Sequence, residues 1–89
     1  MMTKLIPPVI NNNGTSVDEL LSQQRHVTDA LWEAIIAMRD ATPHGQDYQT
    51  LDPSVGAAAR NAHGINITVL QDMLDQYTRQ AIAILQQKR

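Results

Sequence analysis

Three short stretches of the sequence carry side chains that could bind a ligand. The first, NNNGTS at positions 11–16, places amides, two hydroxyls and a glycine just before a strong helical pattern. Backbone N–H groups at a helix start can hold a phosphate or another anion. A helix cap and a turn explain part of this stretch equally well. NNNGTS also lacks the lysine and the glycine spacing of a phosphate-binding P-loop. The candidate ligand-binding residues are Asn13, Gly14, Thr15 and Ser16.

The second stretch is PHGQDY at positions 43–48. His44 and Asp47 offer hydrogen bonds, and Tyr48 offers a ring on which a base or ribose could stack. Gly45 is the fourth candidate residue of this stretch. The alternative is an interhelical turn, in which proline and glycine change the chain direction and Asp47 bonds nearby backbone.

The third candidate is the pair Arg60 and His63. Residues three apart are neighbours on a helix, so the two side chains could share an anion. A single histidine on a helix is also common as a hydrogen-bonded structural residue, and both interpretations stay open here.

Catalytic and metal-binding patterns are poor. His26, Asp29 and Glu33 share a helical face, but the Glu-x-x-His motif of carboxylate-bridged di-metal bundles does not occur. The three histidines are too scattered for a zinc signature, there is no cysteine, and no nucleophile–base spacing is recognisable. We therefore predict a protein that is not an enzyme and needs no metal or cofactor.

Composition limits the classes of protein and partner. Eighty-nine residues make one domain, with 43% hydrophobic but only 3% aromatic residues, which suits helix-on-helix packing. The net charge is -2 and the cations are strung along the chain, so duplex nucleic acid is not the expected partner. Neither a signal peptide nor a membrane-spanning run is recognisable, which predicts a soluble, cytoplasmic protein with no membrane partner.

Local signals predict the elements that position these residues. Pro7 and Pro8 predict an extended arm over 1–12, followed by a helical hairpin over 13–89. Ser16 begins a capping box, S-V-D-E, which starts a helix from 17 to about 41. After a loop at 42–52, Asp52 and Pro53 start a second helix that runs to about 87.

The apolar residues exceed what one hairpin can bury. In the first helix one face carries Leu20, Val27, Leu31, Ile35 and Met38, while Trp32 and Ile36 point elsewhere. In the second helix the main apolar positions are Val55, Ala58, Ala62, Ile65, Val69, Met73, Tyr77, Ala81 and Ile84, with Ile67, Leu70, Leu74 and Leu85 at neighbouring angles, so that residues 65–70 are apolar on several sides. The sequence thus predicts an all-α, antiparallel two-helix hairpin that assembles into a homo-oligomeric helical bundle.

These motifs resemble those of short hairpin proteins encoded by tailed phages and prophages. That group has an N-G-T-S entry motif, a P-N-G-R-D-Y-Y turn and a Glu-His pair in the second helix. Residues 13–16 match the first motif, and Pro43, Gly45, Asp47 and Tyr48 match the turn; His63 matches the last. The chain departs from the pattern at His44, Gln46, Gln49 and Ala62, and loss of the turn arginine removes a group suited to bidentate phosphate binding.

The chain is also similar in size and helix count to phage "sponges", oligomeric hairpins that sequester the cyclic nucleotide signals of host defence. This likeness implies an anti-defence protein that binds a cyclic nucleotide or ADP-ribose-type signal in the host cytoplasm. The entry and turn motifs lie roughly 35 Å apart along the first helix, so a shared pocket requires antiparallel neighbours. The alternatives are an inhibitor or adaptor that binds a host protein through the apolar face around Trp32 and Ile36, and a component of the virion or its assembly.

Overall fold

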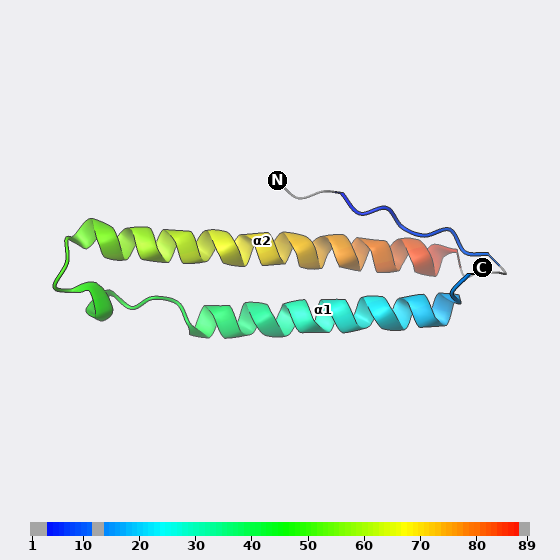
Figure 1. The fold of residues 1–89 in the computed structure, drawn as a ribbon, viewed down its shortest axis with the longest axis horizontal. Coiled ribbons are helices and arrows are strands. Elements are labelled where there is room, and N and C mark those ends of the chain that lie inside the picture. Colours follow the sequence, from blue (N-terminus) through cyan, green and yellow to red (C-terminus); the bar gives the residue numbers. More distant parts are fainter. Residues whose placement is uncertain (1–3, 12–13, 88–89) are drawn as a thin grey trace.

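The chain folds as a helical hairpin flanked by an extended arm (Figure 1). The computed structural model describes residues 4–11 and 14–87. Helix α1 spans Val17–Asp40, a short 3-10 helix η1 spans Gly45–Tyr48, and helix α2 spans Pro53–Gln86. The prediction of an all-α, antiparallel two-helix hairpin is confirmed, each helix ending one residue before its predicted boundary. The helix η1 lies inside the predicted loop.

Side-chain caps set both helix starts. The Ser16 hydroxyl accepts a hydrogen bond from the Glu19 amide at 3.2 Å, as the capping box predicts. At α2, a carboxylate oxygen of Asp52 accepts from the Ser54 amide at 2.9 Å and from its hydroxyl at 2.8 Å. These two bonds, the backbone bond first, lower the pKa of Asp52 and keep the cap ionised.

A narrow contact zone joins the two helices. Within the described residues, Ile35 of α1 and Ile84 of α2 are the fully buried hydrophobic side chains. Gln24 of α1 is also buried, and its side-chain oxygen accepts a 2.9 Å hydrogen bond from the Gln80 amide of α2. The predicted face of α1 is the one turned toward α2, whereas Trp32 remains 50% exposed.

In the first half of α2, the main set of predicted apolar positions faces solvent and not α1. There the residues least exposed to solvent are Gly56, Ala59, His63, Ile67 and Leu70. The predicted residues Val55, Ala58, Ala62, Ile65 and Val69 are all exposed, and we call them the bare stripe. Apart from His63, the residues of both sets are apolar or glycine, and both sets recur at helical spacing, so periodicity could not choose between them. Contacts of Gly56 with η1 and of His63 with α1 decide the rotation of α2.

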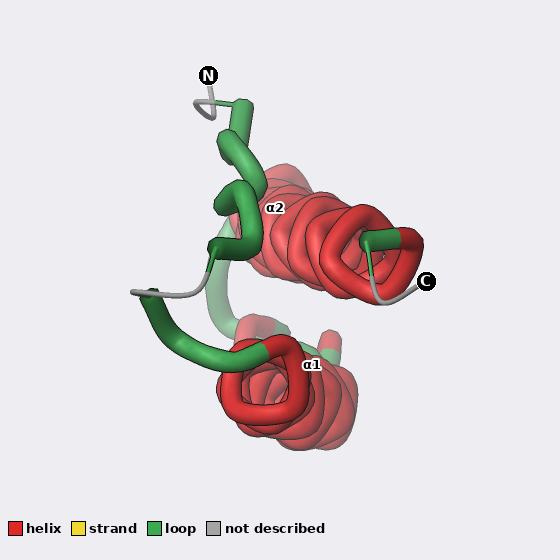
Figure 2. Tube along the Cα trace, turned by 90° about the vertical axis from the view of Figure 1, so that its right-hand side faces the viewer, coloured by secondary structure: helices red, strands yellow, loops and turns green. Residues whose placement is uncertain are grey.

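The arm, residues 4–11, lies beside the C-terminal half of α2 (Figures 1 and 2). Gln87 holds it at one end, where the Gln87 side chain accepts from the Ile10 amide at 2.9 Å and donates to the Pro8 carbonyl at 2.8 Å. Leu5, Pro8 and Ile10 are partly covered, while Ile6 is 89% exposed and Val9 is 80% exposed. The arm therefore buries one side and presents apolar side chains on the other.

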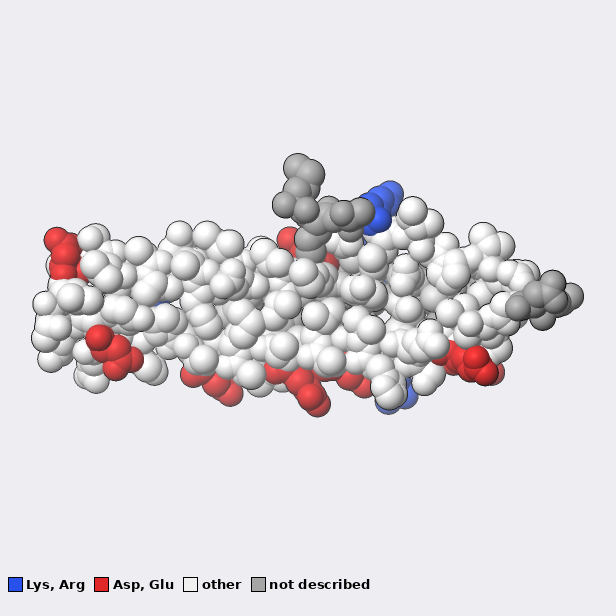
Figure 3. All heavy atoms as spheres, in the orientation of Figure 1, with Lys and Arg blue, Asp and Glu red and all other residues white. Residues whose placement is uncertain are grey.

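The molecule is a long rod of 63 × 22 × 17 Å. Figure 3 views the side on which the arm lies: acidic side chains follow the α1 edge, and the surface over the N-terminal half of α2 is largely uncharged. In the described part of the chain, neither helix combines the length and apolarity needed to cross a bilayer.

Candidate functional site

A hollow at the turn end of the hairpin brings together three of the predicted site residues. It has a volume of about 260 Å³ and lies between η1 and the first turns of α2. We call it the turn-end hollow; its lining residues are Gly45, Tyr48, Gln49, Leu51, Pro53, Gly56 and Arg60. Sequence analysis identified Gly45, Tyr48 and Arg60 but not the other four, which carry no distinctive chemistry.

The position of Tyr48 depends on a glycine of α2. The helix η1 begins after His44, whose carbonyl accepts from the Asp47 amide at 3.1 Å, and this tight turn directs Tyr48 toward α2. A Cβ on Gly56 would lie only 3.4 Å from the Tyr48 Cβ. Tyr48 therefore lies against the backbone of α2 at Gly56, where an added Cβ would just reach van der Waals contact with it.

Arg60 lies one turn beyond Gly56 and reaches back toward η1. Its Nη1 atom would lie 3.6 Å from a Cβ on Gly56 and 3.8 Å from a Cβ on Gly45. In the described residues, the ion pairs join Arg25 to Asp29 and Arg79 to Asp75 and do not include Arg60. The guanidinium is thus available for an anion at the mouth of the hollow.

The other predicted residues of this end lie outside the hollow. His44 and Asp47 are exposed on η1 and do not line it. The Nε2 atom of His63 forms a hydrogen bond with the Met38 carbonyl near the end of α1. This bond commits one ring nitrogen to joining the helices, and His63 is not among the residues that line the turn-end hollow with Arg60. His63 retains its second ring nitrogen.

The entry motif lies at the opposite end of the rod, beside the C-terminal end of α2 (Figure 1). Gly14, Thr15 and Ser16 are exposed there, and Ser16 caps α1. Asn13 lies outside the described residues. Because α1 has 24 residues, about 36 Å separates this motif from the turn end, and one chain cannot join both in one pocket.

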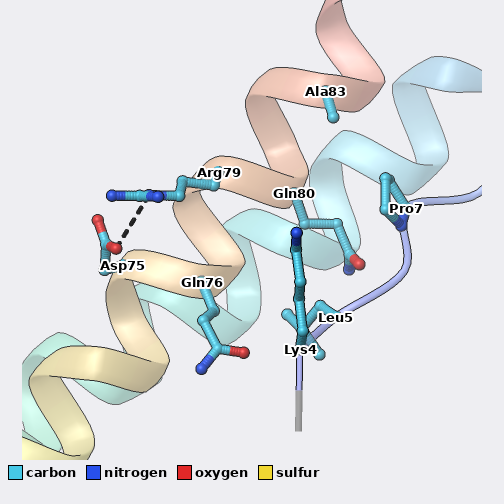
Figure 4. A pocket seen from close by; sticks show the side chains of 8 residues that line it. All are labelled: Lys4, Leu5, Pro7, Asp75, Gln76, Arg79, Gln80 and Ala83. Atoms are coloured by element: carbon cyan, nitrogen blue, oxygen red, sulfur yellow. Dashed lines mark ion pairs between the residues drawn. The ribbon is translucent and has the colours of Figure 1, made fainter.

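A second hollow, of about 410 Å³, lies between the arm and α2 (Figure 4). Its polar walls include Lys4 from the arm and the ion pair of Arg79 with Asp75, whose closest atoms are 3.0 Å apart. Sequence analysis missed this hollow, because the contacts that form it join residues more than 70 positions apart in the chain. No local pattern signals such a contact.

Metal binding finds no support in the part of the chain that the structure describes: no group of three histidine, aspartate or glutamate side chains is close enough to hold an ion. The side chains that line the turn-end hollow also include no carboxylate, imidazole or aliphatic hydroxyl. This hollow can hold a ligand by a guanidinium, a phenol ring and a side-chain amide.

Comparison with known proteins gives no relative: no protein-family model, curated protein or solved structure matches this chain. Its function must be inferred from the geometry above.

Proposed function

We propose that this chain is a non-catalytic, homo-oligomeric phage protein that acts in the host cytoplasm. It binds a small nucleotide-derived signal, of the cyclic nucleotide or ADP-ribose type, and withholds it from a host defence effector. The observation that carries this proposal is the Arg60 guanidinium, which belongs to neither ion pair of the described residues, beside Tyr48 at the turn-end hollow.

The chemistry of the hollow suits a nucleotide. A guanidinium binds phosphate oxygens through paired N–H groups, and a tyrosine ring can stack on a base. Gly45 adds no side chain at the mouth, so a ligand can approach the backbone there. The described walls carry a guanidinium and no carboxylate, which favours an anionic ligand.

The size of the hollow supports a site completed by a neighbour. Its volume of about 260 Å³ lies below the range of about 300–1,000 Å³ typical of small-molecule pockets. A dinucleotide would extend beyond one chain. In an antiparallel assembly the Gly14–Ser16 end of a second copy would meet the hollow and supply amides and hydroxyls to the same ligand.

Thermal unfolding with a panel of cyclic di- and trinucleotides and ADP-ribose derivatives tests the proposal. A compound at about 100 times its Kd should stabilise the protein by about 2.7 kcal/mol, which is several degrees for a small domain. Arg60→Gln and Tyr48→Ala should each abolish the shift, and Thr15→Ala should do so if the neighbour contributes. Arg25→Gln is the matched control, since Arg25 already pairs with Asp29. No shift with any compound, or unchanged shifts in both Arg60 and Tyr48 variants, would refute it.

A second function is favoured by the exposed apolar face of α1. Trp32 is 50% exposed and Ile36 is 42% exposed, four residues apart on one side of the helix. This patch could bind a host protein, which would make the chain an inhibitor or adaptor. Trp32→Ala would then abolish a stable complex with that protein, and the nucleotide response would be absent from the wild type.

A further inference from the structure

We infer that the arm is a dimerisation element: Ile6 of each copy packs on the bare stripe of an antiparallel second copy, and Val9 packs at the level just before the stripe begins. The interface is two-fold symmetric and centres on α2 near Val69. This inference rests on the homo-oligomeric part of the proposed function but does not depend on any ligand.

The first observation is the amount of surface left exposed. The accessible surface is 6802 Å² for a mass of 9.9 kDa, whereas a compact monomer of this mass exposes about 5,200 Å². The excess, roughly 1,600 Å², is twice the ~800 Å² that one partner contributes to a standard interface. The radius of gyration, 18.4 Å, likewise exceeds the ~12 Å expected of a compact domain of this length.

The second observation is that the arm and the bare stripe lie on one face of α2. Gln76 and Ala83, which line the hollow beneath the arm, continue the seven-residue spacing of Val55, Ala62 and Val69. Positions seven apart lie two helical turns apart and drift by only about 20° per repeat around a straight helix. The arm thus lies over a polar C-terminal stretch of α2 that follows, with a gradual turn around the helix, the bare stripe of its N-terminal half.

Third, the arm and the bare stripe match in length, and both present apolar side chains to solvent. An extended arm from Lys4 to Ile10 spans about 19 Å at 3.1 Å per residue, and the stripe from Val55 to Val69 spans about 21 Å. Ile6 and Val9 are the most exposed large hydrophobic side chains of the described chain. The surface opposite them would be the largely uncharged one over the first half of α2 (Figure 3).

Symmetry joins these observations. When two α2 helices run antiparallel about Val69, the covered half of each faces the bare half of the other. Lys4 and Leu5 lie beside Asp75–Gln80, and Ile10 bonds Gln87, so Ile6 lies near the level of Gln80–Ala83. In the antiparallel pair, the Gln80–Ala83 level of one α2 helix lies opposite Ala58 in the α2 helix of the second copy. One contact is thus made twice, as an isologous interface requires.

The same arrangement brings the Gly14–Ser16 end of one copy to the same end of the dimer as the turn-end hollow of the other, because the two ends of the rod exchange places across the two-fold axis. Arg60 lies on the side of α2 opposite to the bare stripe, so this interface leaves the hollow open.

Sedimentation equilibrium of the full chain without nucleotide tests the dimer. We expect a dimer or a multiple of it for the wild type, and half that mass for the double variant Ile6→Ser/Val9→Ser, with unchanged helical circular dichroism. The control, Ile82→Ser/Leu85→Ser, removes side chains that are 49% and 52% exposed on other faces of α2 and should keep the wild-type mass. A monomeric wild type, or an arm variant of unchanged mass, would overturn the inference.

Disulfide cross-linking tests the register. The chain has no cysteine, so Ile6→Cys and Ala58→Cys copies, one carrying a size tag, can be mixed and oxidised. A disulfide between the two kinds of copy is expected, and Ile6→Cys with Glu33→Cys on α1 is the control that should not react. Cross-linking to Glu33→Cys alone would place the arm elsewhere and refute this register. Dimerisation without a nucleotide response would refute only the ligand, and a nucleotide response in a monomer would refute only the dimer.

Discussion

Single residues of α2 show how one residue type serves different purposes in one helix. Gly56 and Gly64 both lie in the helix interior, where glycine costs about 1 kcal/mol relative to alanine. At Gly56 a Cβ would just reach van der Waals contact with Tyr48, 3.4 Å from the Tyr48 Cβ. At Gly64 a Cβ would meet nothing within 4 Å, so the chain itself gives no reason for a glycine.

Gly64→Ala should therefore raise the free energy of unfolding by about 1 kcal/mol. Urea denaturation at one fixed protein concentration measures the effect. Gly56→Ala is the matched control and should give a smaller gain, since its methyl group would press on Tyr48 and narrow the turn-end hollow. A Gly64→Ala protein no more stable than the wild type would show that another molecule closely approaches this face.

At the scale of elements, the hairpin is held by few contacts for its length. Ile35 and Ile84 are fully buried, and a hydrogen-bonded glutamine pair and the His63–Met38 bond add polar links between the helices. The polar links lie at different points along the rod. Sliding one helix by a turn would break both, so they define the register of α1 against α2.

The isoleucines of α2 allow a matched test of this packing. Ile84→Ala should lower the free energy of unfolding by about 2–5 kcal/mol, because it leaves a cavity between the helices. Ile82→Ala removes the same atoms from a side chain that is 49% exposed and should cost well under half as much. Thermal or chemical unfolding compares the two, and equal losses would mean that Ile82 is buried in the assembled protein.

At the scale of the whole molecule, exposed apolar surface dominates. The bare stripe, the outer side of the arm and the Trp32–Ile36 patch all lie in solvent in a single chain. Large exposed apolar patches are typical of surfaces that bind another molecule. In the proposed dimer, the bare stripe and the outer side of the arm are buried in one interface. The Trp32–Ile36 patch on α1 remains available for a larger assembly or a host protein.

The melting temperature should consequently rise with protein concentration, since association stabilises the folded chain by mass action. Differential scanning calorimetry over a wide concentration range measures the rise. The double variant Ile6→Ser/Val9→Ser should melt lower and lose most of this dependence. A wild-type melting temperature that stays constant with concentration contradicts self-association.

Local chemistry in the sequence was sufficient to predict the helices. Ser16 with Glu19, and Asp52 with Pro53, act on backbone groups only two or three residues away, so the cap that forms is the cap the sequence predicts. Pro7 and Pro8 likewise predicted an extended arm without any long-range contact. The sequence also offered Tyr48 and Arg60 as candidate ligand-binding residues, because their side chains suit a nucleotide, but it did not show that the two lie close together.

Tertiary structure alone decided which face of α2 is buried, where the arm lies and which candidates meet. Two apolar stripes recur along α2 at nearly equal spacing, and their local energies do not distinguish them. The choice comes from Gly56 beneath Tyr48 and His63 against the Met38 carbonyl, contacts between different elements. That rotation brings Arg60 back toward Gly45, turns Val55–Val69 outward and leaves His63 between the helices, because a helix can present only one side to its neighbour.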